Sequence, residues 1–227
     1  MVLGHFAVGF ASKRAAPNAS LGALMAAPLL ADLLWPIFLL LGWEHVQIVP
    51  QGKTFHVLAF TSYPWSHSLE MGIVWGIVFG GLYGVLTRYR AGAIVIGLGV
   101  VSHWVLDVIV HVPDLPLTTT GSTRLGLGLW NSVPVTLAIE YLLLAAGVWI
   151  YVHTTRPRDG VGRWSFRVFV GFIAAFYALT LNSGAPPSVT ALAVMTLALW
   201  LFPLWAWWFD KHRLSQAGGL GSAQPRA

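Results

Sequence analysis

Six long apolar stretches constrain the fold of this chain more than any other feature. Each has about the 20 residues that a helix needs to cross the roughly 30 Å hydrocarbon core of a bilayer. Hydrophobic residues make up 56% of the chain and charged residues only 9%, whereas soluble domains carry about 25% charged residues. We therefore expect an all-α, polytopic transmembrane helix bundle with about six spans. The stretches are Ser20–Trp43, Ser66–Thr87, Ala91–His111, Trp130–His153, Trp164–Asn182 and Val189–Phe209.

The first residues, Met1–Ala11, are apolar but too short to cross a bilayer. Lys13 and Arg14 follow them, whereas a cleaved signal peptide carries its basic residues first. We therefore expect a short N-terminal half-helix that stays in the protein. Residues 1–212 are predicted to form a single integral membrane domain. Residues 213–227, rich in Gly, Ser, Ala and Pro toward the end, are predicted to be a disordered cytoplasmic tail.

The basic residues predict the orientation of the chain in the membrane. In the six-span arrangement, eleven of the thirteen Lys and Arg residues fall on one side, and only Lys53 and Arg124 fall on the other. Basic residues in short loops mark the cytoplasmic side. We therefore expect both termini in the cytoplasm. The eleven residues are Lys13, Arg14, Arg88, Arg90, Arg156, Arg158, Arg163, Arg167, Lys211, Arg213 and Arg226.

The same placement argues against a nucleic-acid partner. The net charge is +5, but the basic residues flank apolar stretches, where they set membrane topology. The chain contains no cysteine, so thiolate metal sites, disulfides and cysteine nucleophiles are excluded. Any metal must therefore be held by nitrogen and oxygen atoms.

Four acids fall inside the predicted spans: Asp32, Glu70, Asp107 and Glu140. A charged acid at the centre of a bilayer costs about 2.5–3.5 kcal/mol even on the lenient insertion scale. The bodies of the spans offer no Lys or Arg as a partner. Protonation, histidine, water or a metal ion must therefore compensate these acids.

Histidines recur at helical spacing next to these acids. His103, Asp107 and His111 are spaced i, i+4, i+8, and His67 and Glu70 are spaced i, i+3, so each set should share one helical face. Counting about 1.5 Å per residue from the basic loops places them in the outer half of the membrane. A half-helix rising from Lys13 would bring His5 to the lower edge of the same cluster. The predicted metal ligands are His5, Asp32, His67, His103, Asp107 and His111.

The second span also carries a stripe of glycines at every fourth residue: Gly72, Gly76, Gly80 and Gly84. One face of this helix therefore has almost no side-chain bulk, and we expect another helix to pack closely against it.

The residues around the polar positions carry a family resemblance. PLLADLLWP around Asp32, SYPWSHSLE around His67, SHWVLDVIVHVPDLPL from Ser102 and LGLGLWNSVPVTLAIE up to Glu140 are scattered over most of the chain. The sequence resembles the predicted membrane-bound metal-dependent hydrolases of bacterial inner membranes, especially a poorly characterised six-span branch. The resemblance implies a multi-pass protein of a bacterial-type inner membrane that binds a metal, with His5 matching an early histidine of the family.

The leading hypothesis is a zinc-type hydrolase. His67, His103 and Asp107, with Asp32 or His5, would hold a divalent metal, most simply zinc, with manganese or iron as alternatives. Glu70 or Glu140 would act as general base, and Asn131 would orient a substrate oxygen. Because the cluster lies in the outer half of the membrane, the expected substrate is an amphiphile or lipid near the outer headgroups.

Two other functions fit the same residues. Acids and histidines inside a membrane are also expected in a proton- or ion-coupled transporter or permease, although the internal repeats common in transporters are not apparent here. A non-catalytic, metal-stabilised membrane scaffold is the third hypothesis. The bond cleaved and the oligomeric state are left open by the sequence.

Overall fold

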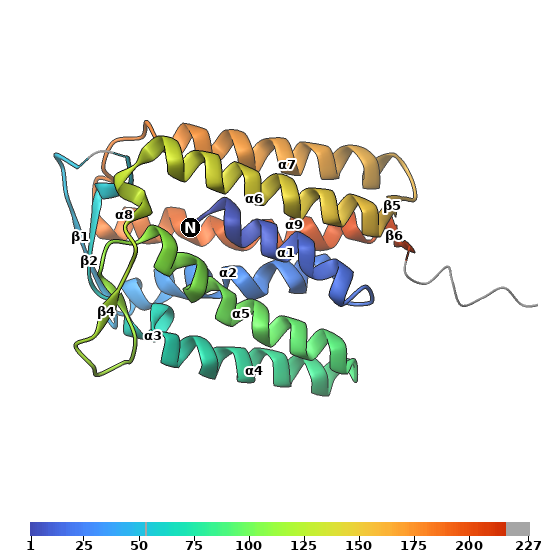
Figure 1. The fold of residues 1–227 in the computed structure, drawn as a ribbon, viewed down its shortest axis with the longest axis horizontal. Coiled ribbons are helices and arrows are strands. Elements are labelled where there is room, and N and C mark those ends of the chain that lie inside the picture. The colour runs from blue at the N-terminus through green and yellow to red at the C-terminus, as the bar shows by residue number, and fades with distance from the viewer. Residues whose placement is uncertain (53, 217–227) are drawn as a thin grey trace, which may run out of the picture.

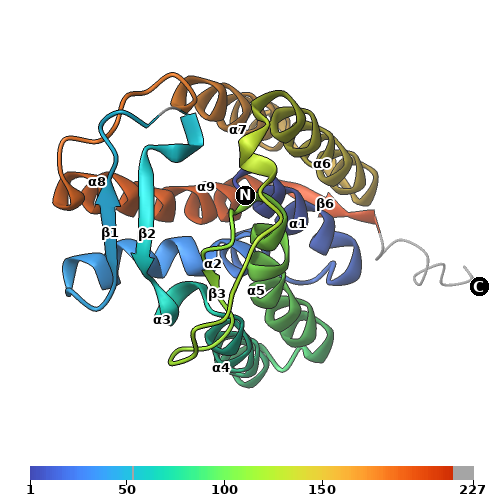
Figure 2. The same cartoon turned by 60° about the vertical axis from the view of Figure 1, so that its left-hand side comes forward.

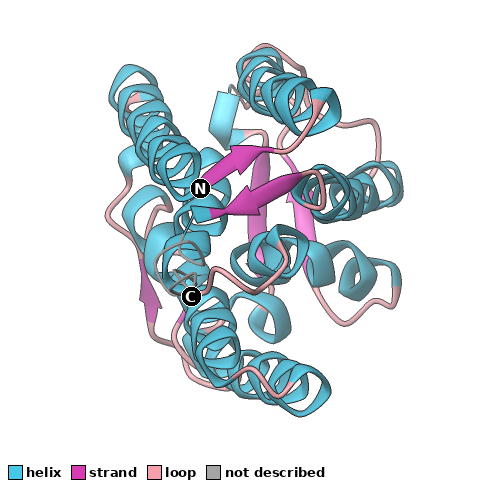
Figure 3. Cartoon of the chain, turned by 90° about the vertical axis from the view of Figure 1, so that its right-hand side faces the viewer, coloured by secondary structure: helices cyan, strands magenta, loops and turns pink. Residues whose placement is uncertain are grey.

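The computed structural model describes residues 1–52 and 54–216 and is a bundle of long helices that run side by side (Figure 1). The helices are α1 Leu3–Ala15, α2 Leu21–Leu40, α3 Pro64–His67, α4 Leu69–Thr87, α5 Arg90–Val110, α6 Val133–Thr154, α7 Gly160–Thr180, α8 Val189–Thr196 and α9 Leu201–Asp210. Single 3-10 turns are η1 Thr54–His56, η2 Leu129–Asn131 and η3 Leu197–Trp200. Figure 3 looks along the bundle and shows the helices grouped around its centre.

In the described chain, the short strands lie between helices or, for the last of them, after the final helix, and they form antiparallel pairs. The pairs are β1 His45–Ile48 with β2 Leu58–Ser62, β3 Leu115–Pro116 with β4 Arg124–Leu125, and β5 Thr155–Pro157 with β6 Arg213–Ser215. The expected all-α class is therefore confirmed at the level of a helical bundle.

Within the described residues, five helical segments are long and apolar enough to cross a membrane: α2, α4, α5, α6 and the run Val189–Asp210 formed by α8, η3 and α9. Helix α7 has 21 residues and lies beside α6 (Figure 1), but it is not among the five. Arg163 and Arg167 in its first two turns lower its hydropathy. A membrane protein is thus supported, while the sixth span stays a prediction.

Helix α1 is short but lies deep in the bundle, in contact with α2, α5 and α6. Helix α1 packs closely against α6: a Cβ added at Gly147 of α6 would lie only 2.4 Å from the carbonyl oxygen of Ala7 in α1. Thirteen residues rise only about 20 Å, so the helix starts inside the bundle and ends at its surface (Figure 2). This placement puts His5, which is fully buried, in the interior.

The predicted glycine stripe packs α4 against α5. A Cβ at Gly76 would lie 2.8 Å from the carbonyl oxygen of Gly97, and one at Gly80 would lie 2.6 Å from that of Ala93. The close approach expected from the stripe is therefore confirmed. Gly72, the first glycine of the stripe, is different: it is buried, yet an added Cβ would meet nothing within 4 Å.

The two ends of the bundle differ. The β1–β2 hairpin and the segment 112–131 cover one end (Figures 1 and 2). Under the hairpin, Trp35, Val46, Tyr63 and Leu115 form part of one buried apolar cluster. The α1–α2 turn, the α4–α5 turn and the β5–β6 pair lie at the other end (Figure 1). This second end carries most of the basic residues of the chain.

The predicted tail is wrong at its start. Arg213–Ser215 forms strand β6, and Arg213 is buried, with its guanidinium donating to Thr155 and to the carbonyl oxygen of Gly162. Residues 217–227 of the predicted tail lie outside the described residues. The sequence placed Arg213 in the tail and among the basic residues of the cytoplasmic side, because nothing local indicates its pairing with segments more than 50 residues earlier.

Candidate metal centre

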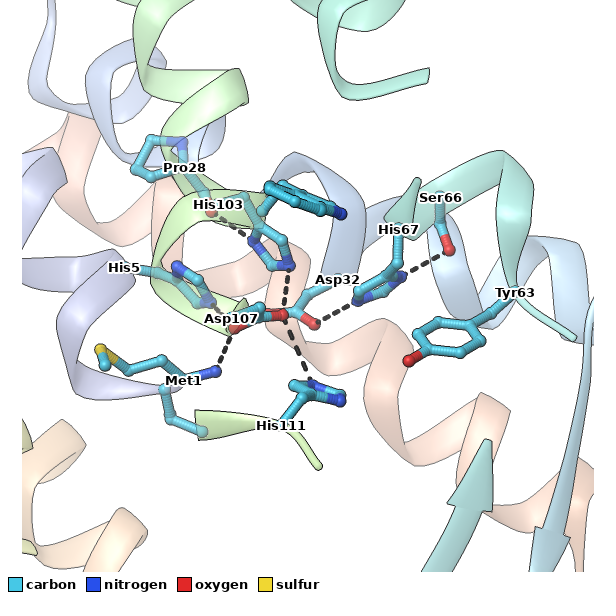
Figure 4. Close-up of polar contacts among 12 residues, drawn as sticks. Met1, His5, Pro28, Asp32, Tyr63, Ser66, His67, His103, Asp107 and His111 are labelled. Atoms are coloured by element: carbon cyan, nitrogen blue, oxygen red, sulfur yellow. Dashed lines mark hydrogen bonds and ion pairs between the residues drawn. The ribbon is translucent and has the colours of Figure 1, made fainter. Parts of the chain in front are cut away.

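The six predicted metal ligands converge at one place inside the bundle (Figure 4). Three of them come from α5 and the residue that ends it, and the others come from three different helices. Five of the six predicted ligands are at most 4% exposed, whereas the side chain of Asp32 is 30% exposed. The contributing elements are α1 (His5), α2 (Asp32), α3 (His67), α5 (His103 and Asp107) and its C-cap (His111).

Asp107 is the centre of this cluster. Its Oδ1 lies 3.1 Å from Nε2 of His5, and its Oδ2 lies 3.1 Å from Nε2 of His103 and 3.7 Å from Nε2 of His111. The helical spacing predicted from the sequence explains why His103, Asp107 and His111 share one face. His5 reaches them because α1 begins inside the bundle.

Asp32 and His67 form the other side of the cluster. Asp32 Oδ1 lies 3.6 Å from Nε2 of His67. Two groups of three therefore have ligand atoms within 4.8 Å of one another: His5, His103 and Asp107, and Asp32, His67 and His103. The groups share His103, whose ring stacks on that of His5 with centroids 4.0 Å apart.

The backbone of α2 fixes the protonation of His103. Its Nδ1 lies 2.8 Å from the carbonyl oxygen of Pro28. A carbonyl oxygen only accepts, so Nδ1 must carry a hydrogen and donate it. In the neutral ring, the lone pair is then on Nε2, which faces the carboxylates. Metal-binding histidines are commonly held in this way by a hydrogen bond from their second nitrogen.

A serine and a glutamate orient His67 in a similar manner. Ser66 Oγ lies 2.6 Å from Nδ1 of His67 and donates to Glu44 Oε2 at 2.6 Å. The hydroxyl has a single hydrogen, so with Glu44 ionised it accepts from His67 Nδ1 and leaves Nε2 free. Glu44 is only 1% exposed, and burial raises the pKa of its carboxyl. Sequence reasoning missed Glu44, which lies outside the spans without a motif around it.

His111 has a carboxylate partner of its own. Its Nδ1 lies 2.9 Å from Asp114 Oδ1, which also accepts from the Tyr63 hydroxyl at 3.1 Å. Nε2 of His111 therefore points toward Asp107 with its lone pair. Asp114, three residues after His111, thus lies at the edge of the cluster. Burial raises the pKa of the Tyr63 hydroxyl, so it stays a donor.

The buried acceptor atoms fit a cation. Nε2 of His103 has no hydrogen-bond partner among the described residues, although Asp107 Oδ2 lies 3.1 Å away. Two ligands of a tetrahedral zinc, each about 2.0–2.1 Å from the ion, lie roughly 3.3 Å apart, which matches the 3.1–3.7 Å separations between the donor atoms. Because His103 offers one lone pair, its two groups describe a single candidate site for a cation.

One positive group near Asp107 was not expected from the sequence. The amino group of Met1 forms an ion pair with Asp107 Oδ1. The prediction that Asp107 has no basic partner is therefore wrong. It considered only the Lys and Arg side chains of the spans, and the partner is the amino group of Met1. This amino group compensates part of the charge that a metal would otherwise balance.

The three predicted catalytic residues do not join the cluster. Glu70 is exposed, and its Oε2 accepts from the backbone N–H and hydroxyl of Thr119. Its predicted shared face with His67 fails because Ser68, in an extended conformation, separates α3 from α4 and caps α4. Asn131 lies in η2 and is exposed.

Glu140 is buried but serves another helix. Its carboxylate accepts from the backbone N–H groups of Val2, Leu3 and Gly4 and from the Tyr177 hydroxyl. It thus caps the N-terminus of α1, where an acid is favoured by the helix dipole. The structure gives Glu140 a structural role in holding α1 and leaves the predicted general base without support.

A small cavity reaches the cluster from the side. Its volume is about 10 Å³, and its walls include His67, His103, Gly72 and Trp75. A cavity of about 10–15 Å³ holds one water molecule. The site therefore has room for one small species next to the two histidines.

Comparisons with protein-family models, with curated proteins and with solved structures found no match to this chain.

Proposed function

We propose that this protein is a membrane-embedded, metal-dependent hydrolase whose single cation is held by His103 and Asp107 together with His5, Asp32 and His67. The observation that carries the proposal is the buried convergence of these donor atoms at 3.1–3.6 Å, with Nε2 of His103 lacking a hydrogen bond among the described residues. Nitrogen and oxygen donors suit zinc, with manganese or iron as alternatives.

The chain's own groups would each contribute to hydrolysis. A divalent cation bound here supplies Lewis-acid polarisation of a water and of a carbonyl or phosphoryl oxygen. Pro28 and Ser66 hold His103 and His67 with their Nε2 lone pairs directed inward. Asp32, with its side chain 30% exposed, is the cluster carboxylate that an incoming molecule reaches first. In place of Glu70 and Glu140, we assign Asp32 as the group that accepts a proton from the attacking water: one of its carboxylate oxygens would hold the cation, and the other would take the proton.

The substrate class follows from the surroundings of the site. Large apolar side chains on the outer faces of α4 and α5 are exposed, including Ile77, Leu86, Ile94 and Leu98, which is the pattern of helices that face lipid. A substrate reaching a site inside such a bundle is best an amphiphile or lipid with an ester, amide or phosphodiester bond. The resemblance to bacterial inner-membrane hydrolases supports the same reading.

We also propose six spans, with α7 as the sixth and both termini in the cytoplasm. The support is the gathering of basic residues at the end opposite the β1–β2 hairpin, together with the place of α7 beside α6 (Figure 1). A topology reporter fused after Arg90 or Arg158 should read cytoplasmic, and one near Gly52 or Gly121 should read external. One reversed reading among the four would refute this topology.

Metal analysis of detergent-purified protein tests the proposed function. The wild type should carry about one equivalent of zinc or a similar metal after supplementation, and His103→Ala and Asp107→Ala should lose it and unfold at a lower temperature, because metal binding is linked to folding. His153→Ala is the matched control, since His153 is exposed and, within the described residues, its one side-chain hydrogen bond is to the carbonyl oxygen of Trp149 in its own helix.

The hydrolysis arm uses lipid and short-chain ester substrates without an ion gradient. Activity that requires the metal and is lost in His103→Ala supports the hydrolase. If the wild type carries no stoichiometric metal, the Met1 amino group and the neighbouring histidines compensate Asp107, and the hydrolase proposal fails. Metal binding without hydrolysis would favour the scaffold, and gradient-dependent proton movement in proteoliposomes would favour the transporter.

A further inference from the structure

We infer that Glu44 is a positioning residue that acts through Ser66 to hold His67 in the orientation and tautomer required for metal binding. The inference rests on the proposed function, because it assigns the support of one proposed ligand. It concerns a residue that lies outside every span and directly before β1.

Both carboxylate oxygens of Glu44 are committed to Ser66. Oε1 accepts from the Ser66 backbone N–H at 2.8 Å, and Oε2 accepts from its hydroxyl at 2.6 Å. Glu44 therefore fixes the start of α3 and the rotation of the Ser66 side chain together. With its single hydrogen donated to Glu44, the hydroxyl can only accept from His67 Nδ1, which lies 2.6 Å away.

The burial of Glu44 also needs an explanation. A carboxylate taken out of water is costly unless its hydrogen bonds are replaced, and this residue is only 1% exposed at a place where a glutamate could readily face solvent. A purely structural link between the hairpin and α3 could be made by a neutral side chain. A carboxylate additionally fixes the Ser66 hydroxyl as a donor toward Glu44, so that it accepts from His67.

Two other histidines of the cluster have comparable partners, which supports this reading, whereas Nδ1 of His5 has no hydrogen-bond partner among the described residues. His103 donates to the Pro28 carbonyl oxygen, and His111 has Asp114 next to its Nδ1. In each case the second ring nitrogen is directed into the cluster. Such outer partners typically change metal affinity about 10- to 100-fold when they are removed.

Paired serine variants separate positioning from folding. Ser66 and Ser68 are both buried and flank His67, but Ser68 bonds to the Pro64 carbonyl oxygen and caps α4 through the Met71 N–H. Zinc affinity is measured by competition with a chelator of known affinity. Glu44→Gln and Ser66→Ala should weaken it about 10- to 100-fold. Ser68→Ala should lower stability and leave the zinc affinity unchanged. Ser66→Thr, which keeps the hydroxyl, should have the affinity of the wild type.

The second readout is the tautomer of His67 in metal-free protein, observed by ¹⁵N NMR at a pH well above the ordinary pKa of a carboxyl group. The wild type should carry its hydrogen on Nδ1, and Ser66→Ala should shift hydrogen to Nε2. Wild-type affinity and tautomer in both Glu44→Gln and Ser66→Ala would overturn the inference, as would an equal loss of affinity in Ser68→Ala. If the wild type binds no zinc, the proposed function fails, and the tautomer alone then decides the role of Glu44.

Discussion

Glu140 gives the sharpest test of how this bundle holds its short central helix. Three successive backbone N–H groups at the start of α1, from Val2, Leu3 and Gly4, donate to its Oε2, and the Tyr177 hydroxyl donates to its Oε1 at 3.0 Å. These N–H groups have no partner inside their own helix. Glu140, from α6, therefore takes the role that a capping side chain usually has.

Replacement by glutamine measures the value of the charge. Glutamine keeps one acceptor oxygen for α1 and can still pair its amide with Tyr177, so most contacts survive in neutral form. A hydrogen bond to a charged group contributes about 1.5–3 kcal/mol and a neutral one about 0.5–1.5 kcal/mol. With two or three bonds weakened by roughly 1 kcal/mol each, and part of the helix-dipole stabilisation lost, Glu140→Gln should lower the free energy of unfolding by about 2–4 kcal/mol.

Two tyrosines supply matched controls. Tyr177→Phe removes one bond to the carboxylate and should cost about 1.5–3 kcal/mol, whereas Tyr141→Phe removes a neutral bond to the Ala174 carbonyl oxygen and should cost about 0.5–1.5 kcal/mol. Because Glu140 and Tyr177 are in contact, their double variant should destabilise by less than the sum of the single changes.

The assay is reversible unfolding in detergent, with and without a chelator. The loss in Glu140→Gln should persist in metal-free protein, since the cap acts on α1 directly, and zinc affinity should fall as well because α1 carries His5. Unchanged stability together with abolished hydrolysis would refute the capping role and restore Glu140 as a catalytic base.

Three further changes test other contacts. Gly80→Ala should cost about 1–3 kcal/mol by overpacking against the Ala93 carbonyl oxygen, whereas Gly81→Ala, which meets nothing within 4 Å, should be neutral or stabilising in the same unfolding assay; equal effects would contradict the packing of α4 on α5. Lys13→Met leaves the buried Asp210 without its ion-pair partner, which lies 2.6 Å away. This change should lower the free energy of unfolding by about 3–5 kcal/mol, measured at constant pH. The pKa of Asp159 lies below its ordinary value, mainly because the Gly162 N–H bonds to its carboxylate. The ionised Asp159 carboxylate contributes its full stabilisation above the ordinary pKa of an aspartate, and this stabilisation is lost as the pH falls through the lowered pKa. Asp159→Asn should therefore reduce stability near neutral pH and remove this part of the dependence of stability on pH. An unaltered stability–pH profile in that variant would contradict the assignment.

The sequence by itself was sufficient for most of the long helices and for the part of the candidate site that lies on α5. Long apolar stretches predict helices because a bilayer leaves the backbone no other partners, and the boundaries of α2, α4 and α5 agree with the prediction to within a few residues. His103, Asp107 and His111 share a face because their spacing is a property of any α-helix. The glycine stripe predicted the close packing of α4 for the same local reason.

Contacts between distant segments were decided only by the tertiary structure. Ser68 breaks the helix between His67 and Glu70, so a face argument that assumed one continuous helix failed there. The Ser66–Glu44 bonds, the Glu140 cap on α1 and the Lys13–Asp210 pair join residues 22, 136–138 and 197 positions apart. Helical periodicity describes which side chains share a face but not which helix that face meets. The partners of a buried charge therefore depend on packing, which places a carboxylate and its donors together from anywhere in the chain.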